Sequence, residues 1–428
     1  MTTLKKSPAA VLLPSAARIA ADIAHFASLS EPGSGVTRLA YSTLERQAHA
    51  YFRAAMEELG LSVRTDAAGN TIAEAAGTDP GARALGTGSH LDSVPSGGRF
   101  DGIAGVAAAM EVARLLSTTG LRTCHPVRIV VFASEEGARF GQACNGSRIV
   151  AGLTDTADLE RLTDADGITM AAAMRSVGLH PHDIGDARWH HDDWAAFIEL
   201  HIEQGSVLES LGVPVGVVDV ISGSTRLAID LHGRASHSGG TPMHQRADAL
   251  AAASELVLLA ERLARRTRHH GTRATVGRLE VSPGSLTTIP GKVRFTLDVR
   301  DVDADRQHQT VSEFLSRATE LCQRRTIRLT SQLLADTPPV VLPERVKHHL
   351  VRASEARGVA YRVMPSGASH DAQMVNRVVP TGMVFVPSRD GISHAPEEWT
   401  NAEDIATGAG VLLEALLALD AEPDRRTA

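Results

Sequence analysis

Residues 86–102 read GTGSHLDSVPSGGRFDG, and this stretch decides how the fold is interpreted. A short apolar run bounded by turn residues is typical of a buried strand, and here such a run ends at His90. The same pattern, with His or Glu after an apolar run, recurs in residues 130–137 (VVFASEEG), 197–205 (FIELHIEQG) and 384–398 (VFVPSRDGISHAPEE). Ligand sites in open α/β sheets lie beyond the carboxyl ends of the parallel strands, so we expect these polar residues to converge on one crevice.

The polar residues at these positions are of the types that bind divalent metal ions. Imidazole nitrogens and carboxylate oxygens are available at His90, Asp101, Glu135, Glu136, His201 and His394. Two clusters of such donors suit a pair of divalent ions, so the sequence predicts a dinuclear metallohydrolase. The chain has three cysteines without CxxC spacing, which argues against thiolate zinc and indicates a reducing compartment. Ligation by N and O suits Zn²⁺, Mn²⁺, Co²⁺ or Ni²⁺.

Each of these residues also has a simpler interpretation. The chain contains 19 histidines, and a single histidine is more often a core or surface residue than a ligand. Glu135 and Glu136 alone resemble an acidic pair that complements the dipole at the start of a helix. Their position directly after an apolar run favours a metal ligand beside a free base. Asp92 lies two residues after His90, on the same face of a strand, where its carboxylate can accept the second ring N–H.

Composition limits the class of protein and its partners. Of the 428 residues, 43% are hydrophobic and 22% are charged, which is typical of a soluble globular protein. The formal net charge is −7 and the basic residues are dispersed, so we expect no nucleic acid and no membrane as a partner. No apolar run approaches the ~18 residues of a membrane span. The N-terminal apolar stretch is short and broken by Pro14, unlike a signal peptide, so we expect a cytoplasmic protein.

The pattern of elements changes along the chain. In the first half strands and helices alternate, and residues 102–117 (GIAGVAAAMEVARLLS) carry apolar residues at helical spacing. The middle block contains alternating strands such as 292–301 (KVRFTLDVRD), which predict an α+β domain with a half-solvated antiparallel sheet. Candidate ligands lie on both sides of this block. We therefore predict an α/β catalytic domain, residues 1–217 and 335–428, interrupted by an inserted α+β domain at residues 218–334.

Together these motifs resemble the amidohydrolase branch of the aminoacylase- and carboxypeptidase-like di-metal hydrolases. This branch contains N-carbamoyl-L-amino-acid hydrolase, allantoate amidohydrolase and β-ureidopropionase. The resemblance covers residues 15–415 and rests on the stretches above together with EEGARFG (135–141), HSGGTPMHQRADA (237–249), IPGKVRFTLDVRD (289–301) and SGASHDA (366–372). It implies a mixed-sheet, di-metal exopeptidase-like catalytic domain. It also implies that the inserted domain is the lid and dimerisation module of a homodimer.

The resemblance also implies roles for individual residues. Asp101 bridges two divalent metal ions in each subunit, Glu135 is the general base, and Asp92 orients His90. His237 reaches the active site of the partner subunit. The implied metal ligands are His90, Asp101, Glu136, His201 and His394. The implied substrate contacts are Gln204, Thr287, Arg300, Gly367 and Ala368, of which Arg300 binds the substrate carboxylate.

The implied reaction is hydrolysis of the C–N bond of an N-carbamoyl-L-amino acid, or a related ureido acid, to the free amino acid, ammonia and CO₂. The substrate is then a small ureido or amide compound that carries a carboxylate. The alternatives are allantoate amidohydrolase activity and N-acyl-amino-acid hydrolase or dipeptidase activity. The HIEQG and GISHAPEE stretches are typical of the carbamoylase branch and count against the second alternative. A non-enzymatic metal-binding protein is disfavoured, because such a protein needs no free base at Glu135.

The sequence departs from the family pattern at one stretch that binds substrate. Where the family usually shows PNAxNVIPG, residues 283–291 read PGSLTTIPG, so Gly284 and Thr287 stand at the two Asn positions. Thr287 offers one hydroxyl group where Asn offers two donors and an acceptor. This departure leaves the candidate metal ligands intact. The class of reaction is therefore better determined than the substrate.

Overall fold

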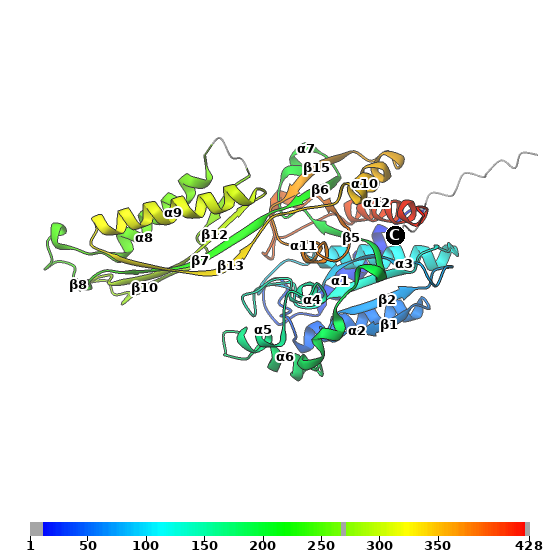
Figure 1. The fold of residues 1–428 in the computed structure, drawn as a ribbon, viewed down its shortest axis with the longest axis horizontal. Coiled ribbons are helices and arrows are strands. Elements are labelled where there is room, and N and C mark those ends of the chain that lie inside the picture. The colour runs from blue at the N-terminus through cyan, green and yellow to red at the C-terminus, as the bar shows by residue number, and fades with distance from the viewer. Residues whose placement is uncertain (1–11, 267–270, 424–428) are drawn as a thin grey trace, which may run out of the picture. The chain divides into compact units, whose positions relative to one another are not determined.

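The computed structural model describes residues 12–266 and 271–423, and the chain forms two compact units (Figure 1). The first unit consists of two chain segments, Met1–Asp219 and Leu342–Ala428. The second unit is the continuous segment Val220–Val341. All five candidate metal ligands therefore belong to the first unit.

A mixed nine-stranded sheet forms the centre of the first unit. In order across the sheet, the strands are β1 (Ser62–Thr65), β2 (Thr71–Ala75), β4 (Val127–Phe132), β3 (Ala84–His90), β5 (Trp194–Ile202), β16 (Thr381–Val386), β6 (Val215–Ile221) and β14 (Val340–Val341), with β15 (Tyr361–Ser366) paired to β6. The neighbours β4, β3, β5 and β16 run parallel, whereas β1 with β2, β2 with β4 and β6 with β16 are antiparallel. The predicted α/β fold class with a mixed sheet is confirmed.

The central strands are buried on both faces, which explains their continuous apolar runs. In β4, Ile129 and Val131 join one core, whereas Val130 and Phe132 join the other. The first core contains residues of α1 (Ala16–Ser28), α2 (Thr43–Glu58), α3 (Ile103–Thr119), α10 (Glu344–Ala356) and α12 (Ala402–Asp420). The second contains residues of α4 (Asn145–Val150), α5 (Thr156–Arg161), α6 (Met170–Ser176), η1 (Pro181–Ala187) and α11 (Asp371–Val375). The remaining short helices of this unit are α7 (Val207–Leu211), η2 (His191–Asp193) and η4 (Arg389–Gly391).

The second unit contains an antiparallel sheet. In order, its strands are β10 (Leu279–Ser282), β12 (Lys292–Asp301), β7 (Gly223–His232) and β13 (Arg328–Thr337), with β9 (Arg273–Thr275) also paired to β12. Every second residue of β12, from Val293 to Val299, joins a core with α8 (Ala249–Ala264) and α9 (Ala304–Arg324). A separate pair is formed by β8 (Ser236–His237) and β11 (Thr288–Ile289), and η3 (Met243–Gln245) follows β8 in the chain. In the described part of both units, no helix is long and apolar enough to cross a membrane.

Candidate metal centre

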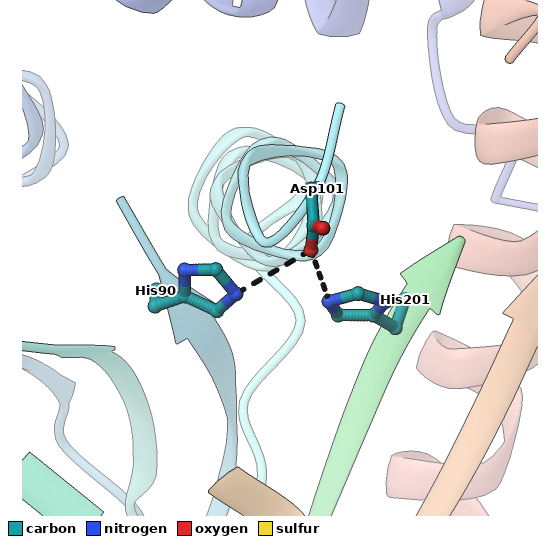
Figure 2. A group of neighbouring side chains, drawn as sticks. All are labelled: His90, Asp101 and His201. Atoms are coloured by element: carbon teal, nitrogen blue, oxygen red, sulfur yellow. Dashed lines mark ion pairs between the residues drawn. The ribbon is translucent and has the colours of Figure 1, made fainter. Parts of the chain in front are cut away.

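Two neighbouring parallel strands bring the first candidate ligands to the same edge of the sheet. β3 ends at His90, and β5 carries His201 one residue before its end. Thr87 of β3 lies opposite Ile198 of β5, so each histidine follows this paired point by three residues. Asp101 precedes α3 and lies between the two imidazole rings (Figure 2).

One carboxylate oxygen of Asp101 faces both histidines. Oδ1 of Asp101 is 3.7 Å from Nε2 of His90 and 3.1 Å from Nε2 of His201 (Figure 2). The exposed fractions of His90, Asp101 and His201 are 2%, 6% and 2%. One donor atom from each of the three lies within 4.8 Å of the others, so the group can hold one metal ion.

A second group of donors shares Asp101 with the first. Oδ2 of Asp101 is 3.1 Å from Nε2 of His394, and this nitrogen is 3.5 Å from Oε1 of Glu136. Asp101, Glu136 and His394 also offer three donor atoms within 4.8 Å of one another. Because each oxygen of Asp101 faces a different group, this carboxylate is placed to bridge two ions. The structure thus brings the five predicted ligand residues together in two groups.

Backbone carbonyl groups orient two of the imidazole rings. Nδ1 of His90 is 3.1 Å from the carbonyl oxygen of Asp92, and Nδ1 of His201 is 2.9 Å from that of Ile202. Because a carbonyl oxygen can only accept, each Nδ1 carries a hydrogen, and Nε2, which faces Asp101, is the nitrogen that remains for a metal ion. In the neutral ring this is the tautomer that binds a metal ion through Nε2.

Asp92 faces the ring of His90 with both its carboxylate and its carbonyl group. The sequence expectation placed the carboxylate on the ring N–H, and Oδ1 of Asp92 is 3.6 Å from Nδ1 of His90. The shorter contact comes from the Asp92 carbonyl group, at 3.1 Å. The carboxylate oxygens also accept the backbone N–H groups of Glu135 and Glu136, each at 2.9 Å. Asp92 therefore orients the turn that carries both glutamates.

Glu135 lies beside the first group of donors without being part of either group. Its Oε2 is 3.8 Å from Nε2 of His90, and the residue is 6% exposed. Burial raises the pKa of Glu135 well above its ordinary value; His90 opposes this rise and the charges of Asp371 and Glu136 add to it. A carboxyl group with a raised pKa can take up a proton and return it near neutral pH.

The site holds an excess of buried negative charge. The buried carboxylate residues of the site are Asp92, Asp101, Glu135, Glu136, Glu199, Asp371 and Glu398. Burial, with the charge of Asp101, raises the pKa of Glu136 to about 7, and the hydrogen bond with Asp101 raises the pKa of His394 to about 9. Both shifts mean that added positive charge is stabilised here. This charge excess and the set of N and O donors fit two divalent metal ions.

Two buried side chains beside His201 were not predicted from the sequence. Glu199 lies two residues before His201 on the same face of β5, and the strand period of two could have indicated it. Its Oε1 accepts a hydrogen bond from Oγ of Ser89 at 2.8 Å. His370 lies in the SGASHDA motif, with its Nε2 2.8 Å from Oγ of Ser366. Glu199, His201 and His370 form a third group of possible donors, adjacent to the first.

Glu398 is a further buried residue that sequence reasoning missed. Its Oε1 accepts the backbone N–H groups of Phe100 and Asp101 at 2.9 and 3.1 Å. Its Oε2 accepts a hydrogen bond from Oγ of Ser393, the residue before His394, at 2.7 Å. Glu398 therefore connects the loop of Asp101 to the loop of His394. Its position in the GISHAPEE stretch was the available signal.

Strained backbone occurs next to the candidate ligands. Ser134, Gln204 and His394 have φ values of 56°, 55° and 57°. Such left-handed conformations cost non-glycine residues roughly 1–3 kcal/mol each and persist where the surroundings impose them, often at functional sites. The backbone conformations of the loops that carry these side chains therefore lower the stability of the folded state.

The predicted substrate contacts of the first unit lie in two loops. Gln204 follows β5, and its Nε2 donates to Oδ2 of Asp101 at 2.7 Å. Oε1 of Gln204 is buried and has no hydrogen-bond partner among the described residues. Gly367 and Ala368 follow β15, and the N–H of Ala368 donates to Oγ of Ser366 at 3.1 Å. Gln204 therefore contacts the carboxylate of Asp101 and keeps Oε1 as a hydrogen-bond acceptor.

The second unit brings two of its predicted site residues together and separates the third. His237 lies opposite Thr288, and the N–H of Ser238 donates to the carbonyl oxygen of Thr287 at 2.9 Å. Arg300 is the second-last residue of β12, at the end of the strand opposite Lys292. Its Nε donates to Oδ2 of Asp298 at 3.0 Å. At ~3.3 Å per residue, the strand places Arg300 about 26 Å from Lys292, the first residue of β12.

Known proteins are similar to this chain in sequence and in fold. A model of Peptidase family M20/M25/M40 matches residues 86–418. An N-carbamoyl-L-amino acid amidohydrolase of Geobacillus stearothermophilus is 43% identical over 382 residues, which cover 89% of this chain and 93% of the relative. An allantoate amidohydrolase of Escherichia coli (strain K12) is 36% identical, with 90% and 92% covered. The crystal structure of a hydantoinase/carbamoylase family amidase from Burkholderia multivorans has a TM-score of 0.86 at 35% identity, with 96% and 99% covered.

These matches confirm the resemblance that the motifs indicated. They cover both segments of the first unit and the second unit between them. The chain belongs to Peptidase family M20/M25/M40.

Proposed function

We propose that this chain is a metal-dependent amidohydrolase that cleaves the C–N bond of an N-carbamoyl-L-amino acid or a related ureido acid. The products are the free amino acid, ammonia and CO₂. The observation that carries the proposal is Glu135, a buried carboxylate beside two groups of metal-binding donors but outside both. A protein that only bound metal would not need this carboxylate. Relatives at 43% and 36% identity that are named amidohydrolases support the reaction type.

The donors suit two divalent ions in each subunit. His90 and His201 would hold one ion, Glu136 and His394 the other, and Asp101 both. Two ions held by these residues would supply a water molecule of lowered pKa and would polarise the carbonyl group of the substrate. N and O donors of this kind suit Zn²⁺, Mn²⁺, Co²⁺ or Ni²⁺.

The residues around these donors handle the proton and the substrate. Glu135 takes the proton of the attacking water and returns it to the nitrogen that leaves. Oε1 of Gln204, buried and without a partner among the described residues, accepts an N–H group of the ureido substrate. The planar guanidinium group of Arg300 binds the substrate carboxylate.

His237 supplies a hydrogen-bond donor. The backbone N–H groups of Gly239 and Gly240 donate to its Nδ1 at 3.1 and 3.0 Å. Nδ1 therefore has the lone pair and Nε2 has the hydrogen. The side chain is exposed, so this N–H can reach a group outside its own unit. A donor aimed at the negative charge that develops on a substrate oxygen is worth roughly 3–4 kcal/mol.

Two copies of the chain are needed to complete each active site. Arg300 is about 26 Å along β12 from the end of the strand that is nearer to His237. An N-carbamoyl amino acid spans at most about 10 Å, a length of some three residues of extended chain. This separation along the strand favours a site in which His237 and Arg300 come from different chains. In a homodimer in which the second unit is the lid and dimerisation module, the partner subunit contributes His237 and Thr287.

A mixture of two inactive variants tests this arrangement. Glu135→Gln subunits and His237→Ala subunits should each form inactive homodimers. Random mixing should restore about a quarter of the wild-type activity, because each hybrid dimer has one site with both residues intact. Activity after unfolding and refolding of the mixture is the measurement. Hybrid dimers that form but remain inactive would show that His237 acts within its own chain or not at all.

Thr287 determines part of the substrate preference. The best substrate should carry a carboxylate but differ from the commonest N-carbamoyl-L-amino acids, since the hydroxyl of Thr287 replaces an amide. Thr287→Asn should shift kcat/KM toward N-carbamoyl-L-methionine by about tenfold relative to the best substrate. Ser285→Asn, an equally exposed change in the same loop, is the matched control and should leave the ratio unchanged. An unaltered ratio in Thr287→Asn would mean that this position does not contact the substrate.

A substrate panel tests the proposed function as a whole. Carbamoyl, formyl and acetyl derivatives of L-amino acids, together with allantoate, should be assayed with each candidate metal after chelation. The highest kcat/KM is expected for a carbamoyl or ureido acid. Allantoate as the best substrate would favour the activity of the 36% identical relative, and N-acyl substrates would favour an aminoacylase. If the best substrate were an amide without a carboxylate, Arg300 would be excluded as the residue that binds the substrate carboxylate.

We also propose that the enzyme acts in the cytoplasm. Its three cysteines, Cys124, Cys144 and Cys322, are all free thiols, as is usual in a reducing compartment. Cell fractionation with an antibody against the chain is the direct measurement.

A further inference from the structure

Cys144 contacts the carboxylate of Glu135 through its side chain. Its Sγ is 3.1 Å from Oε1 of Glu135. The other oxygen, Oε2, faces Nε2 of His90 at 3.8 Å. The two oxygens of this carboxylate therefore have different surroundings, since one meets a thiol and the other faces a candidate metal ligand.

The backbone of Cys144 also forms a hydrogen bond with Glu135. Its N–H donates to the carbonyl oxygen of Glu135 at 2.6 Å, and the N–H of Asn145 donates to that of Ser134 at 2.8 Å. Cys144 has a φ of 59°, a left-handed conformation that residues other than glycine seldom adopt. The residue directly precedes α4, so the direction of its thiol is set by an ordered turn.

The thiol of Cys144 is the donor in this contact. The residue is 1% exposed. Burial, with the charges of Glu135 and Asp371, raises the pKa of the thiol well above its ordinary value, so the sulfur keeps its hydrogen. In its ionised form, which a general base requires, the carboxylate of Glu135 can only accept. The contact is therefore an S–H···O hydrogen bond to Oε1.

We propose that Cys144 is a positioning residue for the general base, an inference that rests on the proposed function for the role of Glu135. Its thiol holds Oε1 and turns Oε2 toward the candidate metal ligands. Oε2 is then the oxygen that receives the proton of the attacking water and passes it to the leaving nitrogen. Cys144 acts only through Glu135, by limiting the rotation of the carboxylate.

Kinetics of Cys144→Ala and Cys144→Ser test the proposal. Removal of the donor in Cys144→Ala should lower kcat about five- to tenfold, the effect of one net hydrogen bond, with KM within about twofold of wild type. Cys144→Ser keeps a donor and should restore most of kcat. Cys322→Ala truncates a buried cysteine of the second unit and is the matched control, with kcat expected to stay within about twofold. The metal content of every variant should equal that of wild type.

The S–H stretching band gives a readout that needs no substrate and no change at Cys144. The chain has three cysteines, so Cys124→Ser with Cys322→Ser leaves Cys144 as the single thiol. In this background, Glu135→Gln should move the band to higher wavenumber, because a neutral amide oxygen accepts more weakly than a carboxylate. Raman or infrared difference spectra record the shift.

Three results would overturn the proposal. Equal losses of kcat in Cys144→Ala and Cys144→Ser would show that the residue only packs. Loss of metal in Cys144→Ala would show that it supports the ligands instead. An S–H band that does not respond to Glu135→Gln would exclude the hydrogen bond, even if neither Cys144 variant folds. Because the spectra require no turnover, failure of the inference and failure of the proposed function are distinguishable.

Discussion

Replacing Glu135 with Gln is expected to lower kcat by about 10²–10⁴-fold, the usual contribution of general acid–base catalysis. The amide has the shape of the carboxylate but cannot take up the proton of the attacking water. Glu135 lies outside both donor groups, so both metal ions and the fold should remain. Steady-state kinetics, metal content per subunit and the thermal unfolding midpoint of the same preparation are the measurements.

Glu136→Gln is the matched control for this experiment. Glu136 is the next residue on the same turn, and its N–H is held by the same Asp92 carboxylate. Its Oε1 belongs to the second donor group, so Glu136→Gln should lose metal before anything else. Near-normal turnover in Glu135→Gln would exclude Glu135 as the base. Equal loss of metal in the two variants would make Glu135 a ligand.

Asp101→Asn is expected to reduce activity to background by removing both metal ions. Oδ1 of Asp101 faces His90 and His201, and Oδ2 faces His394, so one substitution alters both donor groups. An amide replaces one anionic oxygen with an NH₂ group that cannot bind a cation. Elemental analysis should find about two ions per wild-type subunit, as expected for a two-metal site, and less than one in Asp101→Asn.

Substituting a residue that belongs to only one of the two donor groups tests each candidate metal site by itself. His201→Ala and Glu136→Gln should each lose about one ion, since each belongs to one of the two groups that share Asp101. His191→Ala removes an exposed histidine and should retain both ions. Chelation should abolish wild-type activity, and added divalent metal should restore it. Two retained ions in Asp101→Asn, or an active wild-type preparation with fewer than one ion per chain, would contradict the bridging role.

The candidate ligands were predictable because strand ends are local features. An apolar run that is buried on both faces ends where polar residues begin, and this put His90 at the end of β3 and His201 near the end of β5. Parallel neighbours end at the same edge of a sheet, so their convergence followed as well. The alternation in residues 292–301 likewise predicted a strand with one buried face.

The sequence alone was sufficient to predict the fold class, the types of metal-binding residue and the family. Only the tertiary structure decided how these residues are oriented. The carboxylate of Asp92 accepts the backbone N–H groups of Glu135 and Glu136, which lie more than forty residues further along the chain. The carboxylate of Glu398 accepts the backbone N–H of Asp101, which lies 297 residues earlier. The thiol of Cys144 reaches Glu135 through a left-handed turn. Periodicity reports which face of an element is buried, but contacts between loops depend on packing and on local φ and ψ, which the spacing of residues does not encode.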